Sequence, residues 1–110
     1  MTEEQHLLVC LAEECAEIQK EVMKILRFGM IKKDDKPHVT LKGKEVPPNH
    51  ESLKREIVDM FAVLEMLEES GTLDFDKLNM GEGDEMLQAK KTKVAAYMEY
   101  AHKLGQLETN

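Results

Sequence analysis

The chain has 110 residues, 34% of them charged, and a formal net charge of −7. This length predicts one domain, residues 1–110, with a modest core of its own. The negative charge excludes a general nucleic-acid-binding protein, because such proteins neutralise phosphates with a basic face.

The first predicted element is a long amphipathic helix that begins after Thr2 and ends at Gly29. Thr2 and Gln5 have the spacing of a capping box. Apolar residues then recur at helical intervals: Leu7, Leu8, Leu11, Cys15, Ile18, Val22, Ile25 and Leu26. Cys10 and Cys15 point in different directions on such a helix, about 7.5 Å apart along its axis, so they cannot pair.

Two free thiols are typical of a reducing compartment, and no targeting segment is visible at the N-terminus. The apolar run Leu7–Ala12 is too short to cross a membrane. These features predict a cytoplasmic protein without a membrane partner.

Residues 30–48 interrupt the helical pattern with three prolines and five lysines. A segment of this length in a small helical protein is often a lid or a binding loop, although a mobile surface loop would carry lysines equally well. Val39–Leu41 favour a short strand. A second helix is expected to begin with Asn49 or Ser52 as its N-cap and to end at Gly71.

Residues 72–83 read as a connection with one helical turn near 74–78, and a third helix is expected from Asp84 to Gly105. The sequence therefore predicts an all-α fold of three main helices plus short helical pieces. Three helices cannot easily enclose a core and a site, so we expect a homodimer or homotetramer to complete the core.

The first two helices share the pattern Leu-x-x-Glu-apolar-x-acid-apolar, starting at Leu11 and at Leu53. Within each helix the two acids lie about 60° and 120° to the same side of that leucine. When the two apolar stripes pack together, both acidic pairs reach the same border of the core. The four carboxylates concerned are Glu14, Glu17, Glu56 and Asp59.

A single Glu-x-x-Glu pair is usually a solvated acidic flank, but two matched pairs beside apolar stripes favour a metal site. Carboxylates without an intervening lysine or arginine suit Mg²⁺ or Mn²⁺. The sequence has no His-x-x-x-His or Cys-x-x-Cys spacing. Di-iron bundles need Glu-x-x-His repeats, whereas the second member of each acidic pair here is Glu17 or Asp59 and not His.

The segments Glu13–Glu17 and Glu56–Asp59 together resemble the Glu-Glu-x-x-Glu … Glu-x-x-Asp signature of MazG-like nucleotide pyrophosphohydrolases and their dimeric dUTPase relatives. Lys24–Gly29 and Lys90–Val94 look like the corresponding stretches of small phage- and prophage-type members. The resemblance covers nearly the whole chain, except residues 30–48.

The resemblance implies a helical bundle that hydrolyses a (deoxy)nucleoside triphosphate to the monophosphate and pyrophosphate, with water attacking the α-phosphorus. Mg²⁺ held by Glu14, Glu17, Glu56 and Asp59 would bind the triphosphate and activate the water. Glu14 would in addition position or deprotonate that water.

Several basic and aromatic residues are candidates for holding the substrate. Taking Val94 as the centre of the third apolar stripe, Lys90 lies about 40° and Lys93 about 100° from it, with Tyr97 on the same flank. We predict that Lys90, Lys93 and Tyr97 contact the nucleotide. Arg27 is a further phosphate-binding candidate, although an arginine at a helix end also complements the helix dipole.

Two alternatives to a general triphosphate pyrophosphohydrolase stay open. One is a relative of narrow specificity, a dUTPase or a dGTP-directed enzyme. The other is a non-enzymatic helical interaction module whose acids serve solubility.

Overall fold

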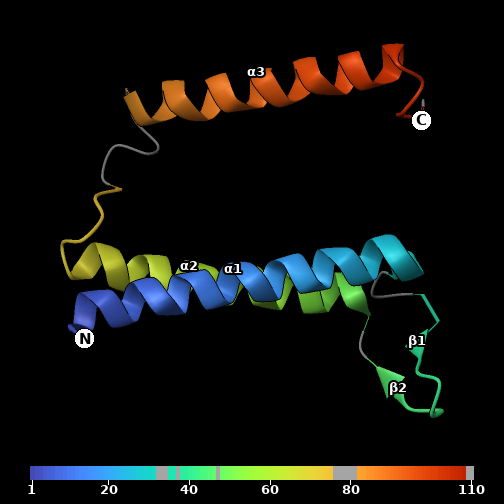
Figure 1. The fold of residues 1–110 in the computed structure, drawn as a ribbon, viewed down its shortest axis with the longest axis horizontal. Coiled ribbons are helices and arrows are strands. Elements are labelled where there is room, and N and C mark those ends of the chain that lie inside the picture. Colours follow the sequence, from blue (N-terminus) through green and yellow to red (C-terminus); the bar gives the residue numbers. More distant parts are fainter. Residues whose placement is uncertain (32–34, 37, 47, 76–81, 109–110) are drawn as a thin grey trace. The chain divides into compact units, whose positions relative to one another are not determined.

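A computed structural model of the chain describes residues 1–31, 35–36, 38–46, 48–75 and 82–108 (Figure 1). The described residues form α1 (Glu3–Phe28), β1 (His38–Val39), β2 (Glu45–Val46), α2 (Asn49–Glu69) and α3 (Glu82–Lys103). Apart from the two short strands the fold is all-α, which confirms the predicted class. The chain divides into two compact units, Met1–Leu73 and Asp74–Asn110.

Helix α1 begins with the predicted capping box. The hydroxyl of Thr2 accepts a hydrogen bond from the Gln5 backbone N–H at 3.1 Å, and the Gln5 side chain accepts one from the Thr2 N–H at 2.9 Å. The helix ends where Gly29 adopts φ 85°, a conformation that residues with a side chain rarely reach. Local sequence thus defines both ends of α1.

The segment after α1 contains a small antiparallel hairpin. His38 pairs with Val46 and Val39 with Glu45. The turn closes through hydrogen bonds from Thr40 N to the Lys44 carbonyl and from Gly43 N to the Thr40 carbonyl, both at 2.9 Å. The expected strand over 39–41 is thus correct at Val39 only, because the chain turns from Thr40 onwards.

Asn49 joins the ends of the first two helices. Its side-chain oxygen accepts a hydrogen bond from Ile31 N, and its side-chain nitrogen donates one to the Gly29 carbonyl, both at 2.7 Å. The N-cap of α2 is Pro48, so the expectation of Asn49 or Ser52 at that position was wrong. Because Asn49 turns back towards α1, it fixes the C-terminal end of α1 beside the start of α2.

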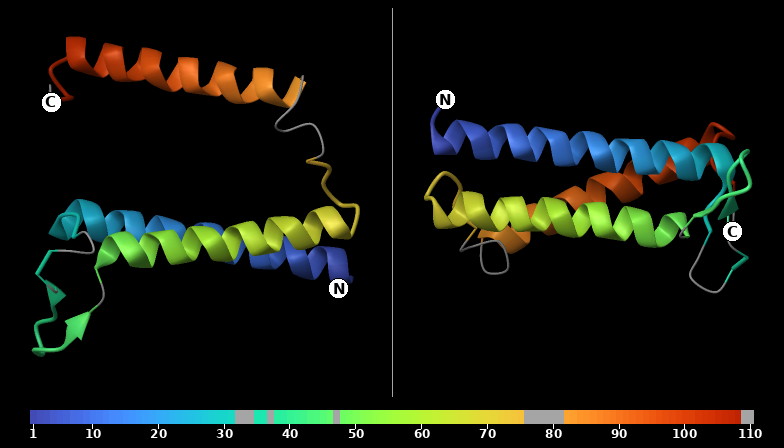
Figure 2. Two further views of the ribbon diagram at one scale, coloured as in Figure 1. Left: turned by 180° about the vertical axis from the view of Figure 1, so that it is seen from behind. Right: turned by 90° about the horizontal axis from the view of Figure 1, so that it is seen from below.

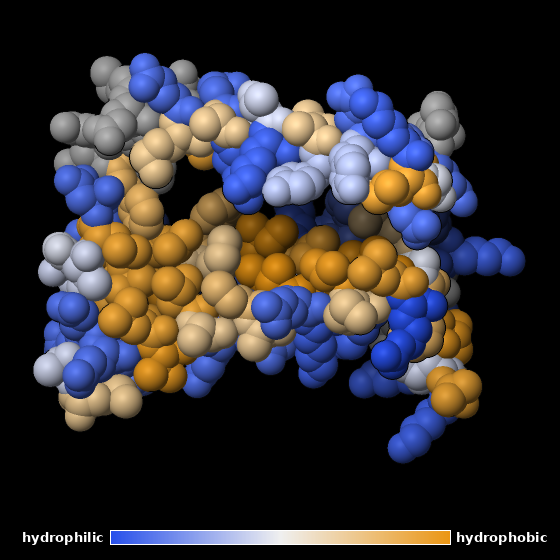
Figure 3. Space-filling view, turned by 45° about the horizontal axis from the view of Figure 1, so that its top comes forward, coloured by the Kyte–Doolittle hydropathy of each residue, from blue (hydrophilic) through white to orange (hydrophobic). Residues whose placement is uncertain are grey.

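Helices α1 and α2 lie side by side and run in opposite directions (Figure 2). Among the described residues, Leu67 is the one apolar side chain that is completely buried. Many large apolar side chains of this helix pair are exposed, including Leu8, Val22, Met23, Leu26, Val58, Phe61 and Met66. Figure 3 shows orange, apolar side chains gathered on the surface that this view presents.

The second unit contains α3, which starts at Glu82, two residues before the expected Asp84. It ends at Lys103, and Gly105 follows with φ 73°. The Gln106 N–H donates to the Ala101 carbonyl at 2.9 Å. The helical turn expected near 74–78 lies mainly outside the described residues. Within the described ranges, no helix combines the length and the apolar character needed to span a bilayer.

Candidate metal centre

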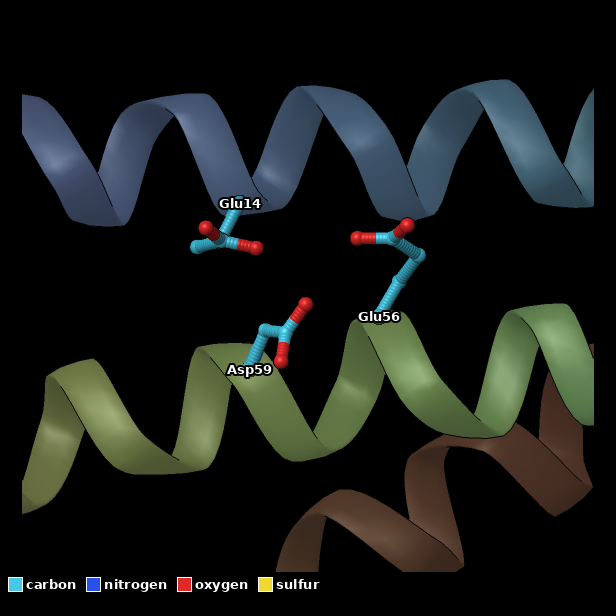
Figure 4. Close-up of side chains that lie close together, drawn as sticks. All are labelled: Glu14, Glu56 and Asp59. Carbon is cyan, nitrogen blue, oxygen red and sulfur yellow. The ribbon is translucent and has the colours of Figure 1, made fainter.

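Three carboxylates converge between the first two helices. Glu14 points from α1 towards α2, and Glu56 and Asp59 point from α2 towards α1 (Figure 4). One oxygen of each lies within 4.8 Å of the others. Glu14 and Glu56 are half-buried and Asp59 is exposed. The structure thus brings together three of the four carboxylates that the sequence singles out.

Helix geometry explains this convergence. Glu56 and Asp59 are three residues apart, so they lie on neighbouring positions of one face of α2. The antiparallel packing of α1 and α2, with Asn49 joining their ends, sets the position on α1 that faces them. That position is occupied by Glu14.

The carboxylate of Glu14 has an unusual environment. Its Oε2 atom is buried and has no hydrogen-bond partner among the described residues. The pKa of Glu14 is raised, first by desolvation and then by the negative charges of Asp59, Glu56, Glu17 and Glu13. A buried oxygen without a donor is unfavourable. A cation placed between the carboxylates would give this oxygen a partner and would offset the repulsion among the negative charges.

The donor set agrees with a hard divalent cation. All three groups offer oxygen, the ligand atom that Mg²⁺ and Mn²⁺ prefer. No lysine or arginine forms an ion pair with Glu14, Glu56 or Asp59 in the part of the chain that the structure describes. Exposed acidic groups are common without a metal. The buried, unpartnered oxygen of Glu14 distinguishes this group from an ordinary acidic surface.

Glu17 lies outside the group of three. Its side chain is exposed, and none of its oxygens belongs to the set within 4.8 Å. It is close enough for its charge to raise the pKa of Glu14. Glu17 therefore borders the centre from α1, one turn after Glu14.

The predicted substrate-binding residues on α3 share one flank of that helix. Lys93 and Tyr97 line an open hollow of about 470 Å³ together with Ala96 and Tyr100. Lys90 lies on α3 one turn before Lys93, and its side chain is exposed. In the other unit, the Arg27 guanidinium lies 5.9 Å from the centre of the Phe28 ring at the end of α1, and both side chains are exposed.

Two residues of interest were missed by the sequence reasoning. Glu21 is a buried acid, 9% exposed, and lies seven residues after Glu14. The signal in the sequence is its heptad spacing from Glu14, which places both acids on one face of α1. Tyr100 borders the same hollow as Tyr97, three residues further along α3.

The raised pKa of Glu14 predicts a pH-dependent stability difference. Because this pKa lies above the usual 4.5 in the folded chain, the folded state binds the proton more tightly than the unfolded state. The contribution of Glu14 to stability is therefore complete below pH 4.5 and is lost as the pH rises through the raised value.

The variant Glu14→Gln stays neutral at every pH. In EDTA, the melting temperature of Glu14→Gln should equal that of wild type at about pH 4 and exceed it at about pH 7. Melting temperatures of both proteins across this range measure the difference. The exposed control Glu65→Gln on α2 should show no such trend. If the difference in melting temperature between Glu14→Gln and wild type did not change with pH, the raised pKa of Glu14 would be contradicted.

Comparison of the chain with protein-family models, with curated proteins and with solved structures gave no match.

Proposed function

We propose that the protein is a Mg²⁺-dependent hydrolase that converts a (deoxy)nucleoside triphosphate to the monophosphate and pyrophosphate. The observation that carries this proposal is the buried, unpartnered Oε2 of Glu14 within a group of carboxylates from two helices. The resemblance of Glu13–Glu17 and Glu56–Asp59 to the MazG-like signature supports the choice of substrate and reaction. Mn²⁺ is the alternative metal.

In this proposal Glu14, Glu56 and Asp59 hold the metal, with Glu17 as a fourth ligand from α1. The bound metal would neutralise phosphate charge and lower the pKa of the attacking water. Glu14 takes the proton from that water as its oxygen bonds to the α-phosphorus. The bond from the α-phosphorus to the bridging oxygen breaks, and pyrophosphate leaves.

The remaining predicted residues would bind the substrate. Lys90 and Lys93 would contact phosphate oxygens as cationic donors, and Tyr97 would lie beside the nucleotide on the same flank of α3. Arg27 would supply a further positive charge from the end of α1.

Self-association belongs to the same proposal. Among the described residues only Leu67 is a fully buried apolar side chain, while both helices of the first unit expose large apolar groups. A homodimer or homotetramer would remove such groups from water, which is the main favourable term in association. Cys10 and Cys15 are free thiols, in keeping with a protein of the cytoplasm.

A substrate panel tests the reaction. Purified protein should release pyrophosphate and the monophosphate from at least one (deoxy)nucleoside triphosphate, and EDTA should stop the release. Turnover of dUTP or dGTP alone would select the narrow-specificity alternative. Orthophosphate as sole product, or activity unaffected by EDTA, would refute the mechanism. A protein inactive on the whole panel would favour the helical interaction module.

A further inference from the structure

Glu21 and Lys24 form an ion pair on α1, and neither residue has a role in the reaction proposed above. Glu21 is 9% exposed, the one charged side chain classed as buried among the described residues. Its Oε1 lies 3.5 Å from the Lys24 Nζ, and the Lys24 side chain is 49% exposed. A buried carboxylate is unfavourable without a partner, and here the partner is a lysine that reaches water.

The pair lies on the flank of α1 that carries the metal-site acids. Around the helix axis, at 100° per residue, Glu21 lies about 20° from Glu14. Glu17 and Lys24 lie about 60° and about 80° from Glu14 in the same direction. Lys24 is about 10 Å beyond Glu17 along the axis. Helical side chains lean towards the N-terminus of their helix, so that of Lys24 leans towards the acids.

The ammonium of Lys24 has donors to spare. It carries three N–H groups, and the structure gives it one carboxylate partner, Glu21. An ammonium held in place by a carboxylate loses less freedom when it binds an anion than a free lysine does. It would be placed to receive a phosphate group that extends along α1 from the carboxylate centre.

We propose that Lys24, positioned by Glu21, binds the terminal phosphates of the nucleotide and then the pyrophosphate that leaves. This inference rests on the proposed function, because it needs a triphosphate whose α-phosphate lies at Glu14, Glu56 and Asp59. Negative charge grows on the leaving group as the bond to the α-phosphorus breaks. A cation fixed at that end stabilises the transition state as well as the bound product.

The experiment compares Lys24→Ala with Lys20→Ala, which removes an exposed lysine one turn earlier on the same helix. We expect Lys24→Ala to lower kcat/KM for the best triphosphate by about tenfold or more. We also expect it to weaken product inhibition by inorganic pyrophosphate by a similar factor. Lys20→Ala should change both quantities less than about twofold, and Lys24→Arg should recover most of the loss.

A second variant tests the positioning role of Glu21. Glu21→Gln keeps the shape and removes the charge, so it should weaken pyrophosphate inhibition while leaving the Mg²⁺-dependent rise in melting temperature intact. Pyrophosphate inhibition equal in wild type and Lys24→Ala would overturn the inference and leave the hydrolase proposal standing. A wild type that hydrolyses no triphosphate would refute the hydrolase proposal itself, and the inference with it.

Discussion

Replacing Asp59 by Asn should abolish hydrolysis while leaving the metal-free protein as stable as wild type or slightly more stable. In the metal-free protein the charge of Asp59 raises the pKa of Glu14, so the two carboxylates repel each other. Asparagine keeps nearly the same shape without the charge. The substitution removes one of the proposed metal ligands and also an unfavourable interaction.

Melting curves with and without Mg²⁺ measure this effect. A ligand that binds only the folded state stabilises it by about 2.7 kcal/mol at a hundredfold excess over Kd. Wild type should therefore melt at a higher temperature in Mg²⁺, and Asp59→Asn should lose most of this rise.

Glu65→Gln is the matched control for Asp59→Asn, since Glu65 is an exposed acid on the same helix. It should retain both activity and the Mg²⁺ effect. Equal Mg²⁺ shifts in wild type and Asp59→Asn would contradict the proposed centre. An acidic flank that only solubilises the helices predicts that equality, together with unchanged activity.

The second large effect is expected at Lys90. Lys90→Ala should lower kcat/KM for the triphosphate by about tenfold or more, equivalent to about 1.4 kcal/mol of transition-state stabilisation. The reason is its place on the flank of α3 that also carries Lys93 and Tyr97. Lysine contacts to phosphate are charge-assisted and strong.

Lys91→Ala is the control for Lys90→Ala. Lys91 lies about 60° to the other side of the Val94 stripe, so it cannot share that flank. Steady-state kinetics of both variants, with melting curves to verify folding, make the comparison. If the two lysines prove equivalent, the assignment of this flank to phosphate binding is wrong.

Local sequence determined most of the helical architecture. The capping box at Thr2 and the glycines at 29, 71 and 105 were readable as helix boundaries because they act through neighbouring backbone groups. The apolar periodicity identified which residues are helical. It did not identify Pro48 as the N-cap of α2, since the side chain of Asn49 bonds back to the end of α1.

Part of the candidate metal centre could also be predicted from the sequence. The repeated acidic pattern singled out Glu14, Glu56 and Asp59, because positions three residues apart on a helix are neighbours whatever the tertiary fold. The same pattern also predicted Glu17 as a metal ligand, on the same grounds as the other three acids. The structure leaves Glu17 exposed and outside the group of three, since only the register between two helices decides which residue faces which.

The sequence by itself therefore determined what depends on neighbours along the chain: helix type, helix ends, and which acids share a face. Tertiary structure alone decided what depends on contacts between helices. It gave Glu14 a buried oxygen without a partner and raised its pKa, and it buried Glu21 beside Lys24. Desolvation and repulsion arise only when α1 and α2 pack together, so no local pattern can report them.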